Sequence, residues 1–343
     1  MKFHNLISVV AGALSPLAVA TEAAAPEKPQ AQVYDPFSLQ GDDHVTVGFE
    51  ALYWKTFENG LGYAIENKNG TTTVNHGHGK TPDFDWNWGG RGSLGFKFPS
   101  WDKWDLQLSY TYFHATSEDH AMAPSNGALF PSFIAPQAGN VFATKASFHG
   151  VIILNASEIE LGRACLVSRF LSLRPSIGVK GVAIHQHFRL HFAGGTVAPV
   201  GDRDLSFMGN LYWGVGPRFA LDSLWGFGGG FSFFANGAGS LVAGRFYGHQ
   251  KEHLDAANIT RLNVRDNESA VVPIAELALG LQWDKMMYNN RFHLGLKVGW
   301  EMQYFFDQNR LLHFHNFSSP GLFSQDRGDL SFMGLTFGFQ FDF

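Results

Sequence analysis

The sequence predicts an all-β protein, an antiparallel transmembrane β-barrel of about ten strands, and three observations support this fold class. Aromatic residues make up 15% of the chain, with 33 Phe and 9 Trp, whereas charged residues make up only 16%. From Val45 onward the apolar residues alternate with polar ones, which is typical of strands with one apolar and one wet face. No run after the N-terminus reaches the roughly 18 apolar residues of a membrane helix. A membrane crossing here therefore requires closed strands.

The C-terminal segment 329–343 shows the alternation most clearly. One register is apolar throughout, and the other is small or polar after Phe332. In a soluble sandwich, the alternative that we weighed, such a face would be an exposed apolar strip. Alternating aromatic residues at the end of the chain resemble the C-terminal assembly signal of bacterial outer-membrane barrels. We expect that signal to comprise Phe337, Phe339, Phe341 and Phe343.

Ten segments carry the alternation, and the links between them alternate between long and short. Short turns such as Asp222-Ser223 and long polar loops are typical of outer-membrane barrels, with both termini on the periplasmic side. The glycine-rich segment 228–239 is predicted to form a bend, a bulge or a lumen-facing irregularity, and twelve strands are the fallback if it hides a hairpin. The ten expected strands are 43–57, 83–98, 104–117, 144–162, 169–192, 205–221, 224–249, 271–285, 291–308 and 329–343.

The N-terminus predicts export. Residues 1–20 combine Lys2, an apolar stretch and a final Ala-Val-Ala, which is typical of a cleaved signal peptide. Residues 21–42 are predicted to form a flexible leader, and 43–343 the barrel. The formal net charge of −5 gives no case for a nucleic-acid partner, and Cys165 is the single cysteine, so no disulfide forms within the chain.

Charged residues in the inward register predict a lumen that either conducts water or is closed by mutual pairing. The signs are nearly balanced, which argues against strong ion selectivity, and ten strands enclose a narrow lumen. The lumen-lining candidates are Arg91, Lys97, Arg174, Lys180, Arg218, Glu276, Arg291, Lys297 and Glu301.

Three other sites were weighed against this pore. Asp83 and Asp85, with His253 and Asp255 as partners, would suit a hydrolase at the barrel rim, but pairing with nearby backbone or basic groups explains them as well. Histidine pairs at 76/78, 185/187 and 313/315 could bind a metal, but they lack acidic neighbours, and solvated histidines are the simpler interpretation. The long segments 58–82, 118–143, 250–270 and 309–328 could bind host surface ligands.

Several motifs, in order and spacing, resemble one family. They are Glu50-Ala-Leu-Tyr-Trp-Lys55, Pro82-Asp-Phe-Asp-Trp86, Trp104-Asp-Leu-Gln-Leu108, Arg174-Pro-Ser-Ile-Gly178, Gly214-Val-Gly-Pro-Arg218, Glu276-Leu-Ala-Leu-Gly-Leu281 and Leu330-Ser-Phe-Met-Gly-Leu335. Together they are similar to the pore-forming major outer-membrane proteins of the Legionella type, also found in chlamydia-like bacteria. The resemblance covers about 45–343 and implies a porin with surface-exposed loops and no catalytic residues. Cysteine cross-linking, associated with such proteins, is in doubt here because Cys165 stands alone.

We therefore expect a bacterial outer-membrane porin that passes small hydrophilic solutes and ions by diffusion, without enzymatic activity, cofactor or metal. Its expected surroundings are the lipid bilayer with lipopolysaccharide and the outer-membrane assembly machinery. A plugged structural or adhesive barrel is the alternative.

Overall fold

The computed structural model describes residues 44–72, 74, 76–98, 104–136, 141–199, 201–288, 291–314, 321–325 and 327–343. The predicted signal peptide, 1–20, and leader, 21–42, lie outside these residues. In the part of the chain that is described, no helix is long and apolar enough to cross a membrane.

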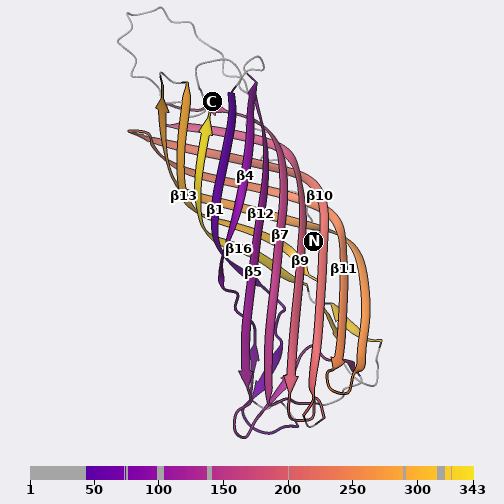
Figure 1. Ribbon diagram of the computed structural model, residues 1–343. Coiled ribbons are helices and arrows are strands. Elements are labelled where there is room, and N and C mark those ends of the chain that lie inside the picture. The colour runs from indigo at the N-terminus through magenta and orange to yellow at the C-terminus, as the bar shows by residue number, and fades with distance from the viewer. Residues whose placement is uncertain are drawn as a thin grey trace, which may run out of the picture. The chain divides into compact units, whose positions relative to one another are not determined.

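Ten long strands form one antiparallel sheet that closes on itself, as the sequence predicts (Figure 1). The first strand pairs with the last, Phe49 opposite Phe339, and every other strand pairs with its neighbours along the chain. Closure satisfies the backbone groups that a free edge would expose to lipid. The strands are β1 (His44–Glu58), β4 (Trp86–Phe98), β5 (Trp104–Met122), β7 (Lys145–Arg163), β9 (Leu171–Ala193), β10 (Arg203–Gly228), β11 (Phe231–Leu254), β12 (Ile259–Met287), β13 (Phe292–Asn309) and β16 (Gly328–Asp342).

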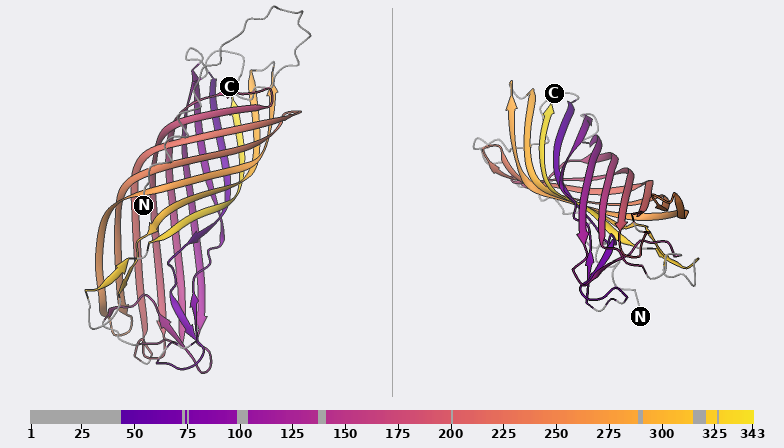
Figure 2. Two further views of the ribbon diagram at one scale, coloured as in Figure 1. Left: turned by 180° about the vertical axis from the view of Figure 1, so that it is seen from behind. Right: turned by 60° about the horizontal axis from the view of Figure 1, so that its bottom comes forward.

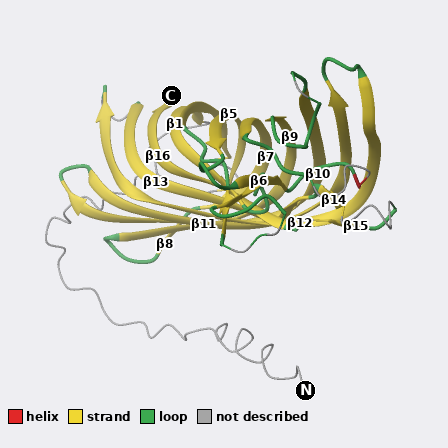
Figure 3. Cartoon of the chain, turned by 90° about the horizontal axis from the view of Figure 1, so that it is seen from below, coloured by secondary structure: helices red, strands yellow, loops and turns green. Residues whose placement is uncertain are grey.

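Short elements accompany the wall. Figure 3 looks from the end that carries the long connections, where β6 (Ala128–Pro131) and nearby loops lie within the outline of the barrel strands. Strand β6 belongs to a small three-stranded sheet, and its Leu129 and the neighbouring Ala64 are buried in the apolar interior of the barrel. The short strands are β2 (Ala64–Asn67), β3 (Gly77–Lys80) and β6 (Ala128–Pro131), which form one sheet, β14 (Leu312–Phe314) with β15 (Phe323–Gln325), and β8 (Cys165–Leu166) beside β9.

The turn between β10 and β11 lies at the start of the glycine-rich segment, so the turn predicted at Asp222-Ser223 was wrong. Asp222 and Ser223 lie inside β10, where Asp222 is opposite Asn236 of β11. The chain instead reverses at Gly228-Gly229-Gly230, with φ angles of 99°, 65° and 83°. Glycine adopts such angles without steric cost, whereas Asp and Ser would be strained there. The rest of the segment to Gly239 is regular strand, and the twelve-strand fallback is not needed.

The predicted loop 250–270 was also wrong. Lys251 pairs with Asn263 in a continuous hairpin of β11 and β12 that turns at residues 255–258. Likewise, residues 118–122 belong to β5. These stretches lack the apolar alternation because they extend past the lipid, where an outward side chain need not be apolar.

The outer wall carries an apolar band. Phe49 is 58% exposed, Val215 57% and Leu281 54%, and on the C-terminal strand Phe337 and Phe339 are 43% and 48% exposed. Large apolar side chains pointing outward all round a closed sheet are what lipid requires and what a soluble sandwich excludes. Figure 2 shows the inclined strands of this wall from two further sides.

The ends of the barrel differ in their connections. Val45 and Phe343 exchange backbone hydrogen bonds at one end, which also holds the short connections 229–230 and 288–291. The opposite end holds the long connections 59–85, 123–144 and 310–327. Short turns mark the periplasmic end of an outer-membrane barrel, so the long connections face outward. Strands β5, β7 and β9 to β12 continue on that side beyond the apolar band, and we call this part the extracellular extension.

Candidate functional site in the barrel interior

The inward faces of the strands carry a network of ion pairs at the level of the apolar band. Arg91 of β4 donates to Glu50 of β1 and to Glu301 of β13, each at 2.6 Å. Lys297 of β13 also pairs with Glu50. The Arg91 guanidinium lies 5.8 Å from the ring centroid of Trp54, and Trp54 borders this part of the network on its extracellular side.

A second group of ion pairs crosses the interior. Nζ of Lys180 on β9 lies 2.5 Å from carboxylate oxygens of both Glu158 and Glu276. Glu276 stands on β12, which is not a neighbour of β9 in the sheet, so this contact spans the lumen. Arg218 of β10 also reaches Glu276, at 2.6 Å, and Glu160, at 2.5 Å. Charges removed from water are stable only in such well-paired arrangements.

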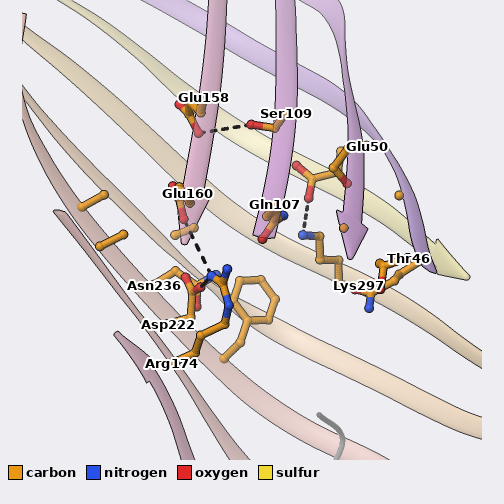
Figure 4. Close-up of a pocket in the computed structure, with 18 of the residues that line it drawn as sticks. Thr46, Glu50, Gln107, Ser109, Glu158, Glu160, Arg174, Asp222, Asn236 and Lys297 are labelled. Carbon is orange, nitrogen blue, oxygen red and sulfur yellow. Dashed lines mark hydrogen bonds and ion pairs between the residues drawn. The ribbon is translucent and has the colours of Figure 1, made fainter. Parts of the chain in front are cut away.

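A third group lies nearer the periplasmic end. Arg174 pairs with Asp105 at 2.5 Å and with Asp222 at 2.9 Å. Figure 4 shows Arg174, Asp222 and Glu160 gathered on one side of the cavity and Glu50 with Lys297 on the other. Across the three groups, carboxylates outnumber cations by seven to five, and Lys97 is a further cation on the cavity wall.

These groups surround a cavity of about 450 Å³. Its wall runs from Thr46, Lys97 and Trp104 at the periplasmic end of the strands up to Glu50, Arg91 and Glu301. The cavity is therefore a polar vestibule that lies on the periplasmic side of the network.

Above the network a layer of buried apolar side chains crosses the interior. Trp54 packs on Phe113, with ring centroids 5.4 Å apart, and Phe113 in turn packs on Phe332 at 5.5 Å. Strand β4 contributes Gly89 here, and a side chain at Gly89 would meet the Phe113 ring at 2.7 Å. We call these residues the apolar layer; each is exposed by 2% or less, and they come from nine of the ten strands: Leu52, Trp54, Phe113, Leu154, Ile184, Tyr212, Val242, Phe246, Ile274, Phe305 and Phe332.

The layer interrupts the lumen. A continuous column of water would leave such side chains partly exposed, and among the described residues these are not. The core continues to the extracellular mouth through Phe148, Phe188 and Leu190 and meets Tyr63 and Phe133 of the long connections. The interior thus has a charged vestibule and, above it, a plug that is mainly apolar. The plug also holds a buried polar group, in which Gln186 donates to Glu58 and Asn210 donates to Gln186.

The predicted lumen residues fall into three positions. Lys180 is fully buried between its two carboxylates and lies off the cavity wall. Arg291 lies in the turn before β13, where it is exposed, because β13 begins one residue later. The residues that line the cavity are Arg91, Lys97, Arg174, Arg218, Glu276, Lys297 and Glu301.

Sequence reasoning missed the apolar layer and also two charged groups of the interior. Asp222 was assigned to a turn, although it pairs with Arg174. His293 is buried between Asp342, at 2.6 Å, and Asp284, at 2.9 Å, near the periplasmic end. The inward register of the last strands, in which His293 and Asp342 stand, was the available signal for this group.

The residues weighed for other chemistry are dispersed. Asp83 pairs with Lys55 at 2.7 Å, whereas His253 and Asp255 lie at the end of β11. His185 and His187 lie on the outer wall, and His313 packs on Phe133 with ring centroids 4.0 Å apart. Among the described residues, no group of three or more His, Cys, Asp or Glu could hold a metal ion.

The closed wall, its apolar outer band and its charged interior define a β-barrel protein of the bacterial outer membrane. The chain belongs to the Legionella major outer membrane protein family: the sequence profile described as the Legionella pneumophila major outer membrane protein precursor matches residues 42–343. No curated protein matches the chain.

Solved structures of outer-membrane barrels are similar in part. The outer membrane protease OmpT from Escherichia coli is 7% identical, with a TM-score of 0.44, over 88% of this chain and 96% of that one. A Pseudomonas aeruginosa FadL homologue is 9% identical, with a TM-score of 0.27, over 88% and 90%. OmpT of Vibrio cholerae is 10% identical, with a TM-score of 0.16, over 87% and 98%. Scores this low support no argument about function.

Proposed function

We propose that this protein works as a closed outer-membrane barrel, a scaffold whose functional surface is its extracellular end. The supporting observation is the apolar layer, in which Trp54, Phe113 and Phe332 are fully buried. An ion or sugar crossing it would lose its hydration without gaining polar partners, which costs several kcal/mol or more for a charged group. The long connections at the extracellular end are then the surface that could bind host ligands.

Diffusion of small hydrophilic solutes is the second candidate, and the vestibule of about 450 Å³ favours it. A porin of this kind would conduct only when the apolar layer moves aside. The excess of carboxylates in the ion-pair network then predicts a preference for cations. The family resemblance also points to a pore.

We further propose that Phe337, Phe339, Phe341 and Phe343 on β16 are recognised by the outer-membrane assembly machinery. Phe337, Phe339 and Phe343 are exposed on the outer wall, where a partner could contact them before lipid does.

Single-channel recording in planar bilayers tests the closed barrel against the porin. We expect the wild-type protein to give no conductance steps, because the buried side chains of the layer leave no open path through it. Combined replacement of Trp54, Phe113 and Phe332 by alanine should open steps, whereas replacement of outward-facing Trp88 by alanine should leave the bilayer silent. Regular cation-selective steps from the wild-type protein would overturn the closed barrel and support the porin.

A further inference from the structure

The outer wall changes character where the strands leave the apolar band. On β10 the outward residues are Val215 and Trp213, and the next strands carry cations just beyond that level. The band there gives way to side chains that lipid tails would reject and water or headgroups accept. We call the following outward-facing residues of β9, β11 and β12 the basic patch: His187, Arg189, Arg245, His249, Lys251 and Arg265.

Strand pairing brings these cations together. Phe207 of β10 has Arg189 on one side and Lys251 on the other. Gly209, two residues along, has His187 and His249 as its two partners, and His249 is opposite Arg265. Neighbouring strands are about 4.8 Å apart, so the His187 and His249 backbones are about 10 Å apart across Gly209.

Because Gly209 has no side chain, the wall is hollow at the centre of the patch. The hollow measures about 320 Å³ and is lined by His187, Arg189 and His249 together with Phe207 and Leu211. A side chain at Gly209 would find its nearest neighbour, Nδ1 of His187, 3.9 Å away, so the space is open. The hollow thus combines cationic groups with an apolar floor.

The positive charge of the patch is not neutralised by neighbouring carboxylates. Among the described residues, Arg189, Arg245, Lys251 and Arg265 have no carboxylate within ion-pair distance. His249 contacts an amide, Oδ1 of Asn263, at 3.0 Å.

We propose that the basic patch binds the phosphate groups of glycolipids in the outer leaflet of the outer membrane. Guanidinium groups suit phosphate because they present paired N–H donors. Phe207 and Leu211 contact the less polar part of the headgroup. The position of the patch, on the lipid-facing wall directly beyond the apolar band, favours a lipid headgroup over a soluble anion.

The full-length protein in detergent or vesicles, with native mass spectrometry to count bound lipid, tests this proposal. The probes are a bis-phosphorylated lipid A, its dephosphorylated form and inorganic phosphate. The charge variant is R189Q/R245Q/R265Q, and the matched control, K68Q/K285Q/R291Q, removes three exposed cations elsewhere. A second variant, G209L, fills the hollow without changing charge. Heat-modified migration on gels verifies that each variant folds.

We expect the wild-type protein and the control to bind phosphorylated lipid A. The charge variant should lose about 100-fold in affinity, since each cation near a charged surface contributes roughly a factor of five. G209L should bind at least several-fold more weakly. Equal binding of the dephosphorylated lipid, a charge variant within twofold of wild type, or inorganic phosphate binding as tightly as the lipid would overturn the proposal.

Discussion

Replacing Lys180 with methionine tests whether the ion-pair network stabilises the barrel. The Lys180 side chain is fully buried, and its Nζ lies 2.5 Å from both Glu158 and Glu276. Removing one partner of a buried ion pair costs about 3–5 kcal/mol, because the other charge is left without compensation. Arg218 still reaches Glu276 at 2.6 Å and Glu158 at 3.6 Å, so the loss should fall near the lower limit, about 3 kcal/mol.

The free energy of unfolding can be measured by urea titration in lipid vesicles, followed by tryptophan fluorescence. The matched control is K68M, since Lys68 is exposed on a connection and its removal should change stability by less than about 0.5 kcal/mol. The triple variant K180M/E158Q/E276Q removes the stranded charges together with the lysine. Replacing a buried ionic group by neutral ones of similar volume is often nearly neutral, so this variant should recover most of the loss.

A K180M variant within 1 kcal/mol of the wild-type protein would refute the reasoning. It would mean that the vestibule, whose wall includes Glu158 and Glu276, hydrates the two carboxylates well enough to replace the lysine. A triple variant less stable than K180M would show instead that the two carboxylates stabilise the wall through Arg218.

Two further predictions concern the outer wall and the extracellular extension. Phe339→Lys on the lipid-facing wall should lower the free energy of unfolding by about 2–4 kcal/mol in the same urea titration. Tyr288→Lys in the periplasmic turn should lower it by at most about 1 kcal/mol. Equal losses would contradict the position of the apolar band. Glu252, beyond the band, accepts a hydrogen bond from the Ala135 amide, and burial together with the charge of Asp204 raises its pKa to about 8. The folded protein therefore holds this proton more tightly than the unfolded chain, and the stability it contributes is complete below about pH 4.5 and is lost as the pH rises through about 8. Urea midpoints at pH 5 and pH 9 should differ less for Glu252→Gln than for the wild-type protein, and an unchanged difference would assign the pH dependence to another group.

The wall was predictable from sequence because lipid enforces a two-residue period. Phe337 and Phe339 alternate with small or polar residues and must face the lipid. The same alternation, repeated along the chain, predicts the ten strands. The alternation of apolar and polar residues is lost where the strands extend beyond the lipid. Residues such as Lys251 and Asn263 face water or headgroups, so both registers there are polar and the hairpin resembled a loop. The turn predicted at Asp222-Ser223 was wrong for a related reason. Two consecutive polar residues in a barrel strand can be a lumen-facing residue and the residue next to it, so such a pair does not require a turn.

The apolar layer was not predicted, because the inward register was expected to be wet. Its signals were present but isolated. Phe332 was the single large apolar residue in the polar register of the last strand, and the run Val151-Ile152-Ile153-Leu154 was apolar in both registers. Ile152 and Leu154 are now found fully buried inside the barrel. Pairing of Lys180 with Glu276 depends on which strands face each other across the closed wall, and no local pattern encodes that.

The plug also constrains the order in which the chain can assemble. The indole of Trp54 on the first strand donates to the Thr336 hydroxyl on the last, across 282 positions of sequence. Phe332 stands on that same final strand. The packing of the bulky plug residues from β1, β5 and β10 is therefore incomplete until the last strand has been synthesised. Until β1 pairs with β16, the apolar residues of the plug are exposed to water and to other chains. We therefore expect the incomplete chain to be prone to aggregation, and pairing of the last strand with the first to remove that tendency.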